Sequence, residues 1–241
     1  MTPKYLRQLD YMFNRPTDEP AWYHRTDSWK EGIFDDNTTD AFIFLETLFL
    51  NAERDLSPYS DEQIGLGFSY IFDNSCSNMT HDFKSADVLF DRKIKALNNL
   101  FALFRDVLNP RCPEILSAFS QATLSKISYI CYMFWDITPL STAYDFSFTE
   151  AKIKTEAEQK PYKNSKLETY NYYAAIAQVM EKCLDLSNPA CVESGLHGLG
   201  HLAFNYPKIA VLIIDNFLKS GKCKDENLIN YAKMAKTGRV L

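Results

Sequence analysis

The sequence predicts an all-α protein. Apolar residues recur at intervals of three and four through most of the chain, a spacing that places them on one face of a helix. Prolines and capping residues separate these stretches and mark where helices begin and end. No segment shows the alternation of apolar and polar residues that is typical of a half-buried strand.

The composition allows a large core without disulfides. The chain has 241 residues, of which 46% are hydrophobic and 14% aromatic, and a chain of this length buries most of the surface that it exposes when unfolded. It has no run of about 18 apolar residues and no signal peptide at the start of the sequence. We therefore expect a soluble protein of the cytoplasm that has no membrane partner.

Five helices are expected before residue 138. Each carries an apolar stripe and ends at a proline or a polar loop. Their ranges are 3–13, 38 or 39 to 56, 60–72, 86–108 and 113–134. Ser60 and Gln63 form a capping box at the start of the third helix, and Pro113 is favourable in the first turn of the fifth.

Residues 138–164 differ from the rest of the chain because they combine two prolines with a run of mixed charge at 150–160. This composition is typical of a solvated, mobile connection. Four more helices follow it, at residues 165–186, 189–204, 207–219 and 225–236. We expect one helical domain over 1–241, with two packed halves, 1–137 and 165–241, as the alternative.

Amphipathic helices joined by short turns must pack against one another to bury their apolar stripes. An irregular stack of antiparallel helix pairs, an α-solenoid of the HEAT or armadillo kind, satisfies this requirement, and a globular helical bundle is the alternative. A short internal similarity favours the stack. Residues 64–68 (IGLGF) and 197–201 (HGLGH) share three identities, and each precedes another aromatic residue.

Five of the eight glycines fall inside predicted helices, namely Gly65, Gly67, Gly195, Gly198 and Gly200. Each costs roughly 0.5 to 1 kcal/mol relative to alanine at such a position. Close approach of a neighbouring helix or of a ligand would compensate for this cost. We favour helix packing.

One segment could carry chemistry. Glu193, His197 and His201 stand at i, i+4 and i+8, which places them on one stripe of a helix. Histidines at i and i+4 have a workable spacing for zinc ligands, and a carboxylate with two imidazoles suits zinc or iron. The HExxH motif of zinc proteases has a glutamate as general base after its first histidine, where this chain has Gly198, and this excludes a protease of that kind.

The length of the helix argues against the metal site formed by Glu193, His197 and His201. Eight residues span about 12 Å along a helix, so all three side chains could not easily reach one ion. The alternative is that the histidines lie in a tightly packed helix and bond to a carboxylate or a backbone carbonyl. Since the chain also lacks a nucleophile elbow and a phosphate loop, no catalytic residue and no cofactor is expected.

Acidic residues are concentrated near the N-terminus. Residues 17–62 hold twelve acidic residues and three Lys or Arg, a net charge of −9, whereas the whole chain has a net charge of −5. This distribution argues against nucleic acid and favours a basic protein partner. The aromatic and acidic side chains expected to contact that partner are Trp22, Trp29, Asp35, Asp36 and Asp40.

Two stretches resemble bacterial helical-repeat proteins. They are residues 59–67 (YSDEQIGLG) and residues 193–201 (ESGLHGLGH), the latter followed by a proline-started helix and by residues 230–238 (NYAKMAKTG). Small acidic helical proteins of this sort are similar to immunity proteins of bacterial toxin systems, which implies neutralisation of a cognate toxin. The leading hypothesis is thus a non-enzymatic interaction module, and the alternative is a metal-dependent helical enzyme.

Overall fold

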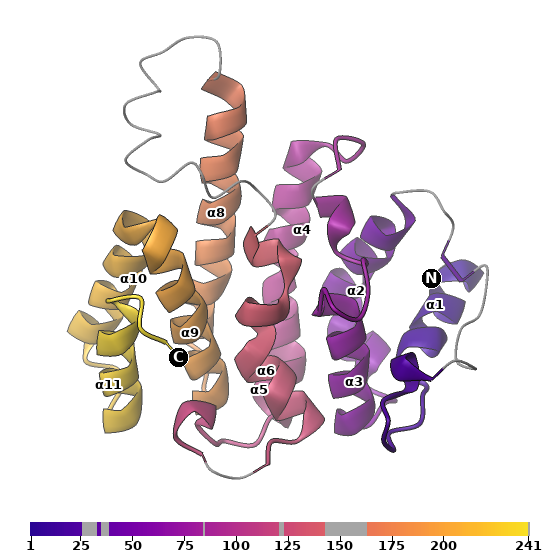
Figure 1. The fold of residues 1–241 in the computed structure, drawn as a ribbon, viewed down its shortest axis with the longest axis horizontal. Helices are drawn as coiled ribbons and strands as arrows, with labels where there is room; N and C mark the ends of the chain where they lie inside the picture. The colour runs from indigo at the N-terminus through magenta and orange to yellow at the C-terminus, as the bar shows by residue number, and fades with distance from the viewer. Residues whose placement is uncertain (26–32, 35–38, 84, 121–122, 143–162, 241) are drawn as a thin grey trace.

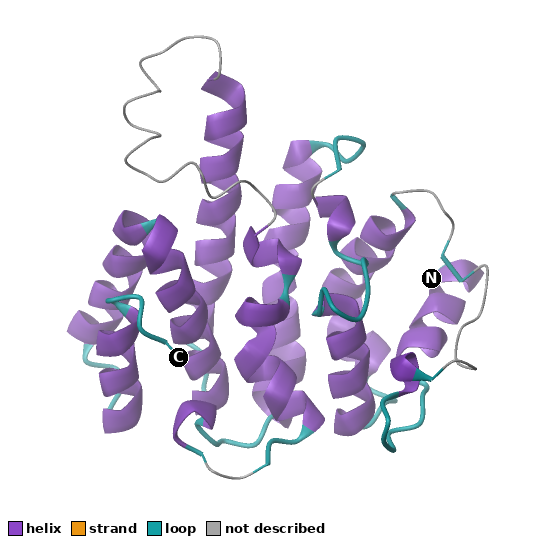
Figure 2. Cartoon of the chain, viewed as in Figure 1, coloured by secondary structure: helices purple, strands orange, loops and turns teal. Residues whose placement is uncertain are grey.

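A computed structural model describes residues 1–25, 33–34, 39–83, 85–120, 123–142 and 163–240 (Figure 1). Within these ranges the chain is helical and contains no strand (Figure 2), which confirms the all-α prediction. No helix in these ranges combines the length and the hydrophobicity needed to cross a bilayer.

The helical segments follow one another along the chain with short connections. In order they are α1 Pro3–Phe13, η1 Trp22–His24, α2 Asp40–Leu56, α3 Asp61–Phe72, η2 His81–Phe83, α4 Phe90–Ala102, the π-helical turn η3 Leu103–Leu108, α5 Asn109–Arg111, η4 Ser117–Phe119, α6 Lys126–Ile137, η5 Pro139–Thr142, α8 Lys163–Cys183, α9 Pro189–Asn205, α10 Pro207–Ser220 and α11 Glu226–Ala235.

The longer helices lie side by side, with α1 at one end of the array and α10 and α11 at the other (Figure 1). In one series of contacts α1 packs on α3, α3 on α6 and α6 on α9. In a second series α2 packs on α4 and α4 on α8, and the contacts of α1 with α2 and of α8 with α9 join the two series. Helices α6 and α9 thus meet near the middle of the array.

Local sequence signals explain where most of these helices begin. Ser60 and Gln63 form the expected capping box at the start of α3. The side chains of Ser125, Asn188 and Asp225 accept backbone N–H groups at the starts of α6, α9 and α11. Gly221 ends α10 with a φ of 63°, a conformation that favours glycine.

Two predicted boundaries are wrong. The helix expected from Pro113 begins only at Lys126, because residues 113–125 place Ile115 and Phe119 in half-exposed positions and offer no continuous apolar stripe. The stop expected at Asn109 and Pro110 does not occur, since the π-helical turn η3 leads directly into α5. Pro110 therefore lies within a continuous helix, where its missing N–H removes one hydrogen bond of the helix.

The helical glycines lie where other parts of the chain approach closely. An alanine Cβ at Gly65 would overlap the backbone of Lys126 at the start of α6, and one at Gly198 would lie 2.7 Å from the indole ring of Trp135. Such distances are too short for non-bonded carbon atoms. Packing against protein atoms therefore explains these glycines, as expected.

The six cysteines are all described, and all carry free thiols. Four of them are buried, and the Sγ atoms of Cys131 and Cys191 lie 3.9 Å apart between α6 and α9. The core is otherwise rich in aromatic rings, among which Trp135 stacks on Phe104 with an interplanar angle of 2°. Trp135 is thereby held rigidly at the point where α6 crosses α9.

Candidate metal centre

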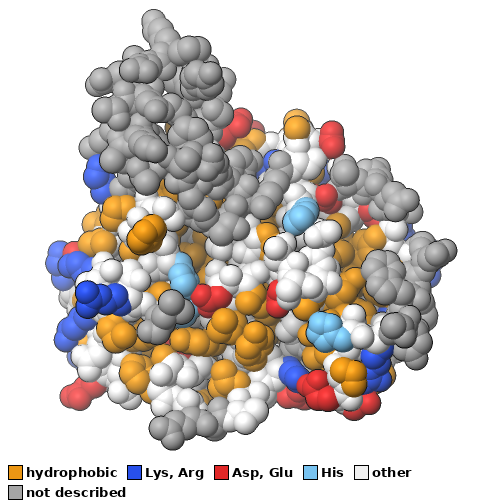
Figure 3. All heavy atoms as spheres, viewed as in Figure 1, with side chains coloured by type: hydrophobic (Ala, Val, Ile, Leu, Met, Phe, Trp, Pro, Cys, Tyr) orange, Lys and Arg blue, Asp and Glu red, His pale blue; other side chains and the backbone are white. Residues whose placement is uncertain are grey.

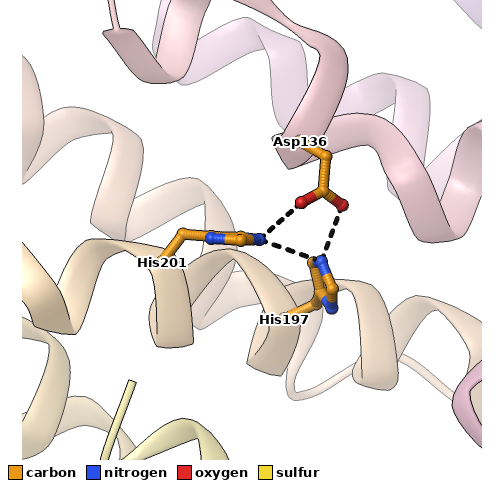
Figure 4. Close-up of side chains that lie close together, drawn as sticks. All are labelled: Asp136, His197 and His201. Carbon is orange, nitrogen blue, oxygen red and sulfur yellow. Dashed lines mark hydrogen bonds and ion pairs between the residues drawn. The ribbon is translucent and has the colours of Figure 1, made fainter. Parts of the chain in front are cut away.

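Asp136, His197 and His201 converge where α6 meets α9 (Figure 4). The two histidines lie one turn apart on α9, and the aspartate lies in the last turn of α6. Gly198 stands between the histidines in sequence, and its missing side chain lets the Trp135 ring of α6 approach the α9 backbone. The glycine thus allows Asp136 to reach both imidazoles.

The three side chains meet through one nitrogen or oxygen atom each. Nε2 of His197 lies 2.7 Å from Oδ2 of Asp136, and Nε2 of His201 lies 2.6 Å from Oδ1. The two Nε2 atoms are 3.0 Å apart. A tetrahedral zinc ion about 2.0 Å from its nitrogen and oxygen ligands separates them by about 3.3 Å, so a small side-chain rotation would open the group to fit an ion.

This group has two chemically sensible states. With a proton on each Nε2, both imidazoles donate hydrogen bonds to the Asp136 carboxylate. With each ring proton on Nδ1 instead, two nitrogen lone pairs and a carboxylate oxygen point at one location, as a metal ion requires. The arrangement can therefore change from a hydrogen-bonded cluster into a set of ligands.

Two tyrosines contact the imidazole ring of His197. Its Nδ1 lies 2.5 Å from the hydroxyl of Tyr231, which is also 3.3 Å from the carbonyl oxygen of Val240. The ring of Tyr132 lies against the imidazole, with centroids 4.7 Å apart. Burial, together with a hydrogen bond to Tyr132, raises the pKa of Tyr231 well above its ordinary value, so this phenol keeps its proton at neutral pH. Such outer contacts fix the orientation of a metal-binding histidine.

The three side chains differ in their access to solvent. The side chain of His197 is 1% exposed, that of Asp136 17% and that of His201 35%. Burial alone would raise the pKa of Asp136, but hydrogen bonds from His197 and His201 outweigh it and hold this pKa well below its ordinary value. The centre therefore presents a carboxylate anion that is closed behind by His197 and open on the side of Asp136 and His201.

A cavity of about 320 Å³ adjoins the open side. Asp136 and His201 form part of its wall, and Gly198 and Gly200 of α9 form another part. The volume lies at the lower end of the range of roughly 300 to 1,000 Å³ that is usual for small-molecule sites. A ligand in this cavity would lie directly beside the three converging side chains.

The sequence-based set of metal ligands is corrected at one position. Glu193 does not join the histidines, because its carboxylate accepts the backbone N–H groups of Ser117 and Ala118 at 2.6 and 3.1 Å. Burial raises the pKa of Glu193 to about 7, although these two hydrogen bonds act in the opposite direction. The span of about 12 Å along the helix already argued against Glu193 as a ligand of the same ion. Its carboxylate instead positions residues 117 and 118.

Asp136 supplies the carboxylate that the sequence analysis assigned to Glu193. It lies 61 residues before His197 in the chain, so no local spacing could identify it. The one available signal is its place after Trp135 at the end of an apolar helix, where a charged residue is common. Only the packing of α6 on α9 shows its role.

The residues predicted to contact a partner do not form a described surface. Trp22 is buried between the rings of Tyr11 and Tyr70, so in this structure it is not available as a surface anchor. Asp40 is also buried and forms an ion pair with Lys4 at 2.7 Å. The remaining three, Trp29, Asp35 and Asp36, lie outside the described residues.

Comparisons of this chain with protein-family models, with curated proteins and with solved structures gave no match.

Proposed function

We propose that this protein is a metal-dependent enzyme whose ion is bound by Asp136, His197 and His201. The observation that supports this is the convergence of three ligand atoms, all within 4.8 Å of one another, beside a cavity. A carboxylate with two imidazoles suits a divalent transition metal ion, with zinc or iron(II) as the first candidates.

The number of ligands favours catalysis over a purely structural ion. Structural zinc sites usually have four protein ligands, whereas catalytic sites have three and leave a position for water or substrate. His197 closes the buried side, so the free position would face the cavity that Asp136 and His201 line. A bound ion would polarise a carbonyl oxygen there and lower the pKa of a water molecule.

The reaction class that fits these features is metal-assisted hydrolysis of a small molecule. Among the described residues, no further His, Cys, Asp or Glu joins the group. An additional carboxylate acting as general base is therefore not part of the proposal. The ion itself would have to activate the water.

The first experiment measures metal binding to the full chain after treatment with a chelator. Titration calorimetry with Zn²⁺ is expected to show one equivalent bound, and Co²⁺ should give visible absorption bands that report its coordination. His201→Gln and Asp136→Asn remove one ligand each and should weaken binding more than about 100-fold. His81→Gln is the matched control, because His81 lies on η2, where it bonds to Asn74, and the substitution should leave binding unchanged.

The second experiment tests catalysis. The zinc-loaded chain should hydrolyse a small 4-nitrophenyl ester, and activity should disappear with chelator and in His201→Gln but persist in His81→Gln. Absence of metal binding, or binding that the ligand variants do not weaken, would mean that the three side chains form only a hydrogen-bonded cluster. Metal binding without hydrolysis would reject the enzymatic part.

The interaction module predicted from the sequence is a separate proposal with its own test. If an acidic surface near the N-terminus binds a basic toxin, pull-down from the native host should recover one basic protein. Reversing the charges of Asp35 and Asp36 should slow that association. Asp40 is unsuitable for this test because its ion pair with Lys4 stabilises the fold.

The stack of antiparallel helix pairs is likewise our proposal for the finer architecture. It is supported by the order of contacts, in which α1, α3, α6 and α9 form one series and α2, α4 and α8 a second. A globular bundle would instead surround one central helix. An experimental structure would distinguish the two arrangements.

A further inference from the structure

We infer that the cavity beside the metal centre binds a small carbonyl compound with an aromatic or branched apolar group, and that this compound accepts a hydrogen bond from the indole of Trp135. The inference rests on the proposed function, because the ion would hold the carbonyl end. It adds the chemical class of the substrate and a residue that recognises it.

The wall of the cavity away from Asp136 and His201 is largely apolar. It is formed by the side chains of Trp135, Tyr173, Ile176, Met180, Leu202 and Phe204. An apolar group that leaves water for such a wall gains about 25 cal/mol per Å² of buried surface. A ligand with a polar end at the centre and an apolar body in the cavity would match both parts.

The surface beside the cavity is apolar as well. Phe204 lines the cavity and is 83% exposed, which is unusual for a phenylalanine. On the face seen in Figure 3, hydrophobic side chains gather over α6. An apolar compound that approaches the centre from this side would meet few charged groups.

Trp135 provides a second, independent sign of a ligand. Its side chain is 1% exposed, and its Nε1 has no hydrogen-bond acceptor among the described residues. A buried indole N–H normally has a partner. The neighbouring carbon of the same ring lies against Gly198, which also lines the cavity. The Nε1 atom itself is covered in this structure, so a bound molecule would reach its N–H by displacing a neighbouring side chain.

The polar residue nearest to Trp135 in the wall does not provide that acceptor. The Ser141 hydroxyl donates to the backbone carbonyls of Trp135 and Thr138, at 3.0 and 2.9 Å. Its hydrogen bonds therefore go to the backbone, and it is no partner of the indole nitrogen. The Trp135 N–H is left as the donor that an incoming oxygen or nitrogen atom could use.

The experiment uses two probes that bind a metal through the same group but differ in their apolar part. Acetohydroxamate and benzohydroxamate are titrated into the zinc-loaded full chain by calorimetry. The phenyl ring should enter the cavity, and benzohydroxamate is expected to bind at least about 10-fold more tightly. Ile176→Phe fills the cavity and should remove this preference.

The Trp135 contact is followed separately by NMR. The chain has three tryptophans, so it should give three indole N–H cross-peaks, and Trp135→Phe identifies one of them by its loss. Benzohydroxamate should shift this cross-peak and leave that of Trp22 in place. Because this readout uses the unaltered chain, it holds even if Ile176→Phe fails to fold.

The outcomes separate this inference from the proposed function. Equal affinities for the two hydroxamates together with an unmoved Trp135 cross-peak, on a chain that binds zinc, would overturn the inference alone. If the chain does not bind zinc at Asp136, His197 and His201, both proposals fall. A clear preference for benzohydroxamate with a shifted Trp135 cross-peak supports both.

Discussion

Asp55 and Asp136 are both shielded carboxylates in the last turn of a helix, but their neighbours differ. Asp55, at the end of α2, accepts hydrogen bonds from the Tyr5 hydroxyl and the Arg54 guanidinium, each at 2.7 Å. These donors keep their protons at all ordinary pH values. Asp136 lies between two imidazoles, whose Nε2 atoms can either donate a hydrogen bond or offer a lone pair.

The difference separates a structural carboxylate from one that can take part in chemistry. Around Asp55, donors and acceptor are matched permanently, and nothing is gained by adding an ion. Around Asp136, the same hydrogen-bonded shape becomes a set of three metal ligands once each imidazole carries its proton on Nδ1 and leaves Nε2 free. Burial alone does not distinguish the two sites, whereas the chemistry of the neighbouring groups does.

The largest effect is expected at Glu193, a third buried carboxyl group. Among the described residues, its only hydrogen-bond donors are uncharged backbone N–H groups, so it tests how far neighbouring groups decide the behaviour of a buried carboxylate. Its pKa is raised from 4.5 to about 7, so its contribution to stability is present below about pH 4.5 and is lost as the pH rises through 7. The shift corresponds to a loss of about 3 kcal/mol over this interval. In Glu193→Gln this loss should be absent.

The measurement is urea unfolding of the metal-free chain between pH 4.5 and 8. All other groups are the same in the two proteins, so the difference between wild type and Glu193→Gln isolates the carboxyl group. If the free energy of unfolding changes with pH in the same way in wild type and in Glu193→Gln, then Glu193 is no harder to ionise in the folded chain than in the unfolded one.

Removing the carboxylate of Asp55 should have the next largest effect on the free energy of unfolding. Asp55→Ala leaves the buried Tyr5 hydroxyl without its acceptor and should reduce the free energy of unfolding by about 2.5 kcal/mol. Asp185→Ala is the control, because Asp185 forms an exposed pair with Lys222 and should cost less than about 0.5 kcal/mol. Similar losses in the two variants would contradict the structural role of Asp55.

The smallest expected effect concerns the support of His197. Tyr231→Phe removes the hydroxyl that contacts Nδ1 and should weaken zinc binding by about 10-fold, or about 1.4 kcal/mol. Calorimetric titration of the variant beside wild type provides the value. Tyr59→Phe serves as the control, since Tyr59 packs on Phe13 near α1, and an equal loss in both would show that the tyrosine at the centre has no special role.

The helices could be predicted from sequence because each carries its own apolar stripe and its own capping residues. The capping box at Ser60 is complete within four residues, and the cost of glycine in a helix indicated close packing at Gly65 and Gly198 before any neighbour was known. Information of this kind is local, so a single stretch of sequence contains it.

The candidate site could be predicted only in part. His197 and His201 lie one turn apart, and their spacing alone places both side chains on one face of the helix. The third member, Asp136, comes from another helix, and Glu193 was chosen because it lay on the same stripe. The absence of an α-helix directly after Pro113 also depends on a distant part of the chain. Ser117 and Ala118 donate hydrogen bonds to Glu193, which lies 76 and 75 residues further along, respectively.

The contact between Tyr231 and Val240 links the orientation of His197 to a segment outside the helices. The carbonyl of Val240 lies beside the phenol that contacts His197, and its side chain fills the space left by Gly200. The segment at Val240 therefore braces Tyr231 and α9 at the same time. A change that loosens this segment would let the imidazole of His197 turn, although the segment touches neither that ring nor Asp136 in the contacts described above.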